Sequence, residues 1–168
     1  MHPRLEKRWK DLEDRRVALV QRVTDLPATR RGNRPADGTF SPVEVIQHFA
    51  LVEKGNVAYM RKAPPASLLG QNPKPSFIFH KTLKSMRDPN KAVATLPSMR
   101  PKSGSSLEGA AQLWEEMRVE TSGYLGQVRD PHDPMVRFNI LFGLASAWDY
   151  LDLLEAHTYY HEQRFPKV

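Results

Sequence analysis

Residues 40–53 read FSPVEVIQHFALVE and contain the start signal of a long helix. Ser41 supplies a capping hydroxyl, a proline follows at the first helical position, and Glu44 stands three residues after the cap, as in a capping box. Apolar side chains then recur every three or four residues, so we expect an amphipathic helix over about 41–62. His48 falls in the middle of this helix, on a face that it shares with apolar residues.

Three further stretches repeat apolar residues with the same period, and each is bounded by proline, glycine or aspartate. We expect these helices over about 3–26, 105–129 and 136–163. No stretch alternates as a strand would. The sequence therefore predicts an all-α four-helix bundle in a single domain over residues 1–168.

The connection between the second and third helices is predicted to be a long crossover. Residues 64–104 hold seven of the fourteen prolines, which excludes long regular elements. A short helix over 76–86 is still expected, with Phe77, Leu83 and Met86 docking on a neighbouring surface.

Charge is unevenly distributed. The chain has a formal net charge of +6, yet residues 61–102 alone contain nine lysines and arginines and one aspartate. This stretch is expected either to be a solvated loop or to form a rim that holds a small anionic substrate. It contains no nucleic-acid-binding motif, so no nucleic-acid partner is expected.

Composition and hydropathy exclude other classes. There are no cysteines, which rules out disulfide scaffolds, thiolate metal sites and a cysteine nucleophile. Neither a signal peptide nor a run of roughly 20 apolar residues is present, so we expect a cytoplasmic protein with no membrane partner.

Three of the six histidines lie on predicted helix faces. His157 and His161 stand four residues apart, so their imidazoles can converge on one ion. Such a pair also arises by chance, and a lone His48 is more often a hydrogen-bonded core residue. Together, the three supply three nitrogen ligands and leave coordination positions open, which is the stoichiometry of a catalytic metal site.

The residues around His48 and His157 carry a family resemblance. The stretch from Phe40 to Glu53 resembles the second helix of the DinB-like (YfiT-type) superfamily, in which an aromatic residue, Ser, Glu and His recur at these spacings. The pair His157 and His161 resembles the His-x-x-x-His of that family's last helix. The order of the motifs, their separation and the proline-rich crossover are also similar.

This resemblance implies that His48, His157 and His161 bind one divalent metal ion, most often nickel or zinc. It also implies a metal-dependent enzyme of the S-transferase or hydrolase type, because characterised relatives use thiols such as glutathione, mycothiol or bacillithiol. A metal with open positions lowers the pKa of a bound water or thiol, which suits this chemistry. We expect a small, anionic substrate and a homodimer.

Other polar residues have assigned roles. Asn56 and Tyr59 lie near the His48 face and are expected to line a pocket, and Arg164 is expected to face the site mouth. Glu44 is explained by the capping box, and Glu53 lies on another side of its helix. Asp152 and Glu155 are candidates to accept a hydrogen bond from a ligand imidazole, although most such helix carboxylates are solvated.

Two competing hypotheses follow from the same residues. In the first, the chain is a non-catalytic helical module that binds an anionic partner through residues 61–102. In the second, the three histidines hold a metal for stability alone.

Overall fold

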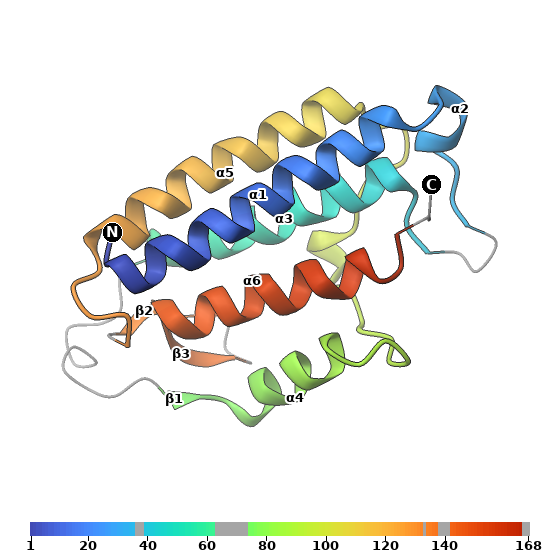
Figure 1. The fold of residues 1–168 in the computed structure, drawn as a ribbon. Helices are drawn as coiled ribbons and strands as arrows, with labels where there is room; N and C mark the ends of the chain where they lie inside the picture. The colour runs from blue at the N-terminus through green and yellow to red at the C-terminus, as the bar shows by residue number, and fades with distance from the viewer. Residues whose placement is uncertain (36–38, 63–73, 133, 138–141, 166–168) are drawn as a thin grey trace.

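The computed structural model describes residues 1–35, 39–62, 74–132, 134–137 and 142–165. Four long helices lie side by side along one axis (Figure 1). They are α1 (Pro3–Asp25), α3 (Pro42–Met60), α5 (Leu107–Gln127) and α6 (Ala147–Glu162). The chain runs in one direction along α1 and α6 and in the opposite direction along α3 and α5. The predicted mostly helical bundle is confirmed.

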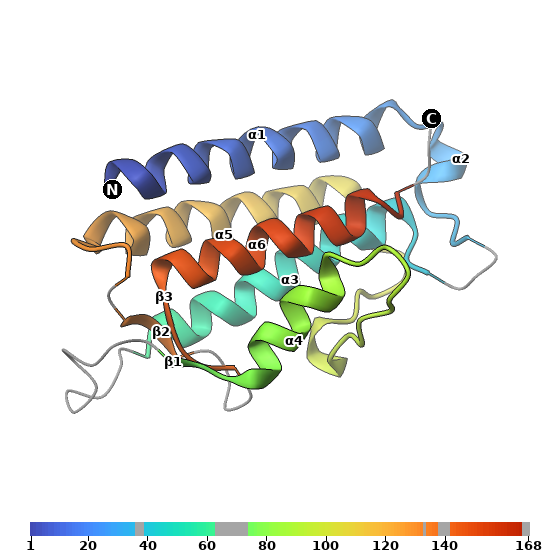
Figure 2. The same cartoon turned by 60° about the horizontal axis from the view of Figure 1, so that its bottom comes forward.

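The long crossover follows from this arrangement. Because α3 and α5 are parallel, the chain must return along the 19 residues of α3, a length of about 28 Å at ~1.5 Å per residue. The returning segment contains β1 (Lys74–Pro75), α4 (Phe77–Met86) and the 3-10 helix η2 (Pro97–Met99). Figure 2 shows α4 packed beside α6. The crossover and its short helix are confirmed, while the predicted break at residues 63–65 lies outside the described residues.

One packing prediction for α4 is wrong. Phe77 does not dock, because its side chain is 80% exposed. The adjacent Phe79 and Leu83 are buried instead, while Met86 packs partly buried against the core. Ser76 caps the helix by accepting a hydrogen bond from the backbone N–H of Phe79.

The loop predicted after the first helix also contains a helical turn. Residues 28–31 form α2 (Ala28–Arg31), which has no side-chain cap and buries no residue. Arg31 stabilises this turn, because its guanidinium donates hydrogen bonds to the carbonyl oxygens of Thr24 and Leu26 at the end of α1.

The predicted fourth helix is wrong over its first part. Instead of a helix from residue 136, the chain forms β2 (Pro134–Arg137) and β3 (Gly143–Ser146), and α6 begins only at Ala147. With β1 these strands make a small antiparallel sheet in the order β1-β3-β2, so the expectation that no strand would form is wrong as well. The helix was predicted wrongly here because periodicity alone does not distinguish a short apolar strand from a segment of a helix.

Two local features explain this change of structure. Gly143 has φ 76°, and a Cβ there would lie 2.9 Å from the Lys74 carbonyl oxygen of the neighbouring strand, so both conformation and space favour glycine. Ser146 and Asp149 form a second capping box, in which each side chain accepts from the other's backbone N–H. This serine-to-aspartate spacing is visible in the sequence and marks the true start of α6.

Replacing Ser146 with alanine is expected to lower the free energy of unfolding by about 1 kcal/mol, since the N–H of Asp149 loses its acceptor. Urea denaturation followed by circular dichroism measures the change. Ser103→Ala is the matched control, because Ser103 is exposed in a turn. Equal midpoints for the two variants would contradict a capping role for Ser146.

The core lies between the four long helices. The apolar residues of α1 that face the other helices are buried: Leu5, Trp9, Leu12, Leu19 and Val23. The ring of Phe49 stacks on Trp114 at 4.7 Å and joins α3 to α5. Among the described residues, no helix combines the length and apolar character needed to cross a membrane.

Candidate metal centre

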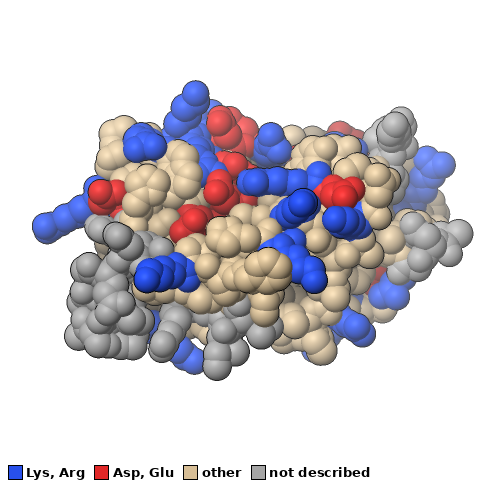
Figure 3. Space-filling view, turned by 90° about the horizontal axis from the view of Figure 1, so that it is seen from below, with Lys and Arg blue, Asp and Glu red and all other residues tan. Residues whose placement is uncertain are grey.

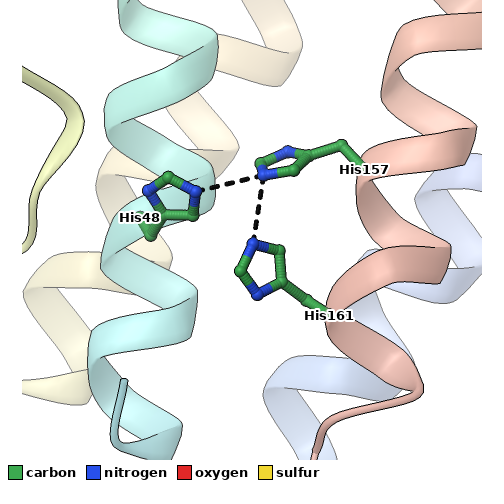
Figure 4. Close-up of side chains that lie close together, drawn as sticks. All are labelled: His48, His157 and His161. Atoms are coloured by element: carbon green, nitrogen blue, oxygen red, sulfur yellow. Dashed lines mark hydrogen bonds between the residues drawn. The ribbon is translucent and has the colours of Figure 1, made fainter. Parts of the chain in front are cut away.

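The three predicted ligands meet in the interior of the bundle. His48 projects from α3, and His157 and His161 project toward it from successive turns of α6 (Figure 4). The Nε2 atom of His157 lies 3.1 Å from Nε2 of His48 and 3.1 Å from Nε2 of His161. All three side chains are buried, and one nitrogen from each lies within 4.8 Å of the others.

The capping box at the start of α3 helps to place His48. Ser41 accepts from the N–H of Glu44, and the carboxylate of Glu44 accepts from the N–H of Ser41. The same carboxylate pairs with Arg34, which lowers the pKa of Glu44. Glu44 therefore has the structural role expected from the sequence. Because the box defines where α3 begins, it also defines which face of the helix carries His48.

A backbone carbonyl orients His48. The carbonyl oxygen of Met99, at the end of η2, lies 2.8 Å from Nδ1 of His48. A carbonyl only accepts hydrogen bonds, so the facing Nδ1 carries the proton and the lone pair of neutral His48 is on Nε2. That lone pair points at the other two histidines. No residue type signals a backbone contact of this kind, so sequence reasoning missed Met99.

Burial keeps the three imidazoles neutral. Desolvation lowers the pKa of His48, and the pKa of His157 falls well below its usual value because burial and the two neighbouring imidazoles both oppose a positive charge. Burial, the imidazole of His48 and the guanidinium of Arg164 lower the pKa of His161 to about 3. Neutral imidazole is the form that binds a metal ion, so no proton competes at neutral pH.

The donor set fits one divalent ion. Bonds of ~2.1 Å at tetrahedral angles would place two ligand nitrogens about 3.4 Å apart, close to the two 3.1 Å separations. Hydrogen bonds among the three imidazoles explain the arrangement less well. His48 presents a lone pair to His157, so that contact needs a proton on Nε2 of His157. This atom can carry one proton but faces two nitrogens. A cation shared by three lone pairs satisfies all of them.

Aromatic rings shield one side of the cluster. The ring centre of Phe49 lies 5.0 Å from that of His157 and 5.1 Å from that of His161. The ring centre of Phe40 lies 5.2 Å from that of His48. These rings offer no competing ligand and restrict access of water from that side.

A cavity of about 360 Å³ borders the three histidines. Its volume falls within the ~300–1,000 Å³ typical of small-molecule sites. Most of its wall is aliphatic or aromatic and comes from α3, α4, the crossover and α6, as shown by Val52, Ile78, Met86, Leu96, Leu154 and Tyr160. The two expected pocket residues, Asn56 and Tyr59, line this cavity.

Arg164, which was expected to face the site mouth, is not among the described residues that line the cavity. Its guanidinium donates to the carbonyl oxygens of Tyr160, Pro89 and Lys91 and lies 3.8 Å from the centre of the Tyr160 ring. The hydroxyl of Tyr160 in turn accepts from the N–H of Val93. Arg164 and Tyr160 therefore attach the crossover, which forms part of the cavity wall, to the end of α6. The spacing of Tyr160, three residues after His157, was the available sequence signal for its role.

The remaining carboxylates lie apart from the histidines. Asp152 and Glu155 were candidates to accept a hydrogen bond from a ligand imidazole, but each pairs with the guanidinium of Arg8 at 2.7 Å instead. Glu53 is buried on another side of α3, as expected, where it pairs with Arg118 and accepts from the indole N–H of Trp114.

Two facing helices of this bundle contribute three buried histidines beside a cavity. The protein is therefore of the class of helical bundles whose core has the side chains to hold a metal ion. The chain belongs to the DinB superfamily, whose family model matches residues 11–163. No curated protein and no solved structure shows a significant match to it. The family membership inferred from the motifs around His48 and His157 is confirmed.

Proposed function

We propose that this chain is a divalent-metal-dependent enzyme in which His48, His157 and His161 hold one zinc or nickel ion. The reaction is a thiol-dependent S-transfer or a hydrolysis. The ion supplies Lewis acidity, which lowers the pKa of a thiol cosubstrate or water and makes it a nucleophile near neutral pH.

One observation carries this proposal, namely the convergence of three Nε2 atoms beside a cavity. Three protein ligands leave a coordination position open, as in catalytic rather than structural zinc sites. Because the chain contains no cysteine, a thiol nucleophile must come from a cosubstrate.

The residues around the histidines have distinct tasks. The Met99 carbonyl holds the His48 ring in one tautomer and one orientation. The ring of Phe49 excludes water behind His157 and His161. The cavity wall holds the substrate against the open side of the centre, which lowers the entropic cost of bringing the reactants together.

Cobalt substitution tests the proposal and separates the two nucleophiles. The untagged full-length chain is expected to bind one equivalent of Co²⁺ with the intense visible absorption of a site with fewer than six ligands. Addition of 2-mercaptoethanol or glutathione should then produce a sulfur-to-cobalt charge-transfer band if a thiol is the cosubstrate. A spectrum that changes only with pH would indicate water. Binding of far less than one equivalent would contradict the proposal.

The competing hypotheses give different results. A module that binds an anionic partner through residues 61–102 would bind polyanions equally well with and without chelator. A site that holds metal for stability alone would bind Co²⁺ but leave the spectrum unchanged by thiols and by pH. Homodimer formation stays a prediction from the sequence, and sedimentation velocity tests it.

A further inference from the structure

The cavity beside the three histidines lacks charged side chains. Apart from the histidines, none of the described residues that line it carries a carboxylate, an ammonium or a guanidinium group. Its polar groups are hydroxyls, such as that of Thr82, and the amide of Asn56. Burying an ionised group against such a wall is costly, because nothing replaces the water that it loses.

The positive charge of the crossover lies elsewhere. All nine lysines and arginines of residues 61–102 are exposed, and none lines the cavity. Figure 3, seen from the α4 side, shows lysine and arginine side chains in separate groups, with uncharged surface and some acidic side chains between them. Some are already paired, since Arg61 binds Glu120 and Lys91 binds Asp88. Arg164, three residues after His161, is engaged with backbone carbonyl oxygens.

One buried amide in the cavity wall has a hydrogen-bond donor to spare. The side chain of Asn56 is 6% exposed, and its Nδ2 carries two N–H groups, of which the hydroxyl of Tyr150 can accept one. Among the described residues, no acceptor lies within hydrogen-bond geometry of the other. A buried amide N–H without an acceptor is costly, because it has lost its hydrogen bond to water. A ligand that offers an acceptor to this atom recovers that cost.

We infer that the cavity accepts a neutral, mainly apolar small molecule that carries a hydrogen-bond acceptor for Asn56. This inference rests on the proposed function, because such a molecule would be the substrate attacked at the metal centre. The nucleophile is one anionic group, and its charge offsets that of the metal ion. The described residues that line the rest of the cavity offer no cation to a second anionic group. The charged parts of a thiol such as glutathione therefore lie outside the cavity.

Two probes with one skeleton and different charge test this inference. They are 3-phenylpropanamide and 3-phenylpropanoate, each titrated calorimetrically into the full-length chain freed of metal by chelation. The neutral amide is expected to bind at least about tenfold more tightly than the carboxylate, because the wall offers no cation to a negative charge. Tighter or equal binding of the carboxylate would overturn the inference in favour of an anionic ligand. Absence of binding by both probes would overturn it too.

A variant locates the acceptor site. Asn56→Leu keeps a similar volume and removes the donor, so affinity for the amide should fall about tenfold. Asn33→Leu, at an exposed asparagine, is the matched control and should not change it. An unchanged affinity in a folded Asn56→Leu would overturn the role of Asn56, and the wild-type probe series remains decisive if that variant does not fold.

The two proposals fail separately. Metal content is measured on the same preparations before chelation. Selective binding of the amide by a chain that takes up no metal would refute the proposed function alone. One equivalent of metal without selectivity for the amide would refute the inference alone.

Discussion

Replacing His157 with alanine is expected to abolish stoichiometric metal binding. His157 is the central histidine, since its Nε2 lies 3.1 Å from both of the others. Loss of a residue that merely orients a ligand weakens metal affinity roughly 10–100-fold, so loss of a ligand should exceed about 100-fold. Elemental analysis of the untagged protein, after incubation with Zn²⁺ and dialysis, measures the effect.

Thermal unfolding provides the second measurement. An ion present at ~1,000 times its Kd stabilises a protein by about 4 kcal/mol, so chelation should lower the Tm of the wild type and leave that of His157→Ala unchanged. His132→Ala serves as control, because His132 is exposed and lies outside the cluster. If His157→Ala retains one equivalent of metal, the three-histidine site is wrong.

The largest effect on stability is expected at Arg118. Its side chain is 2% exposed and binds the equally buried Glu53 at 2.8 Å and Glu13 at 3.0 Å. Arg118→Met leaves the carboxylate of Glu53 without its cation, and breaking a buried pair in this way costs about 3–5 kcal/mol. Urea denaturation measures the loss.

The pH dependence of this variant identifies the cause. Burial already raises the pKa of Glu53, and Arg118 opposes that shift. Without Arg118 the folded chain should hold a proton on Glu53 to a higher pH than the unfolded chain does. Stability is then lost as pH rises, and the destabilisation is larger at alkaline than at mildly acidic pH.

Two variants provide the controls. Adding Glu53→Gln to Arg118→Met should restore part of the stability, because the neutral amide still accepts from Trp114 and needs no cation. Arg61→Met breaks the exposed pair with Glu120 and should cost no more than about 1 kcal/mol. A loss at Arg118 as small as that at Arg61 would show that the buried pair contributes little.

The sequence was most informative where the signals are local. The capping box at Ser41 and the apolar period placed His48 inside a helix, and a four-residue spacing placed His157 and His161 on one face. The same reasoning failed at residues 136–137 and 143–146, where strands form in place of the predicted helix. There, Gly143 and the Ser146–Asp149 capping box decide the outcome.

Arg164 and Asp152 show a different limit. Asp152 lies within α6 and Arg164 follows its end, so their places relative to this helix were predictable. Their partners were not, because Pro89 and Arg8 come from distant parts of the chain. Side-chain length and charge alone do not indicate which distant group a helix surface will meet.

Helix positions, capping and histidine spacing thus follow from residues a few positions apart. The cluster of three histidines needs α3 and α6 to face each other across the bundle interior, which brings together nitrogens of residues 109 positions apart. The proton position on His48 depends on a carbonyl 51 residues away, and the uncharged cavity depends on which face the crossover turns inward. These features come from long-range contacts, whose partners a local periodicity does not encode.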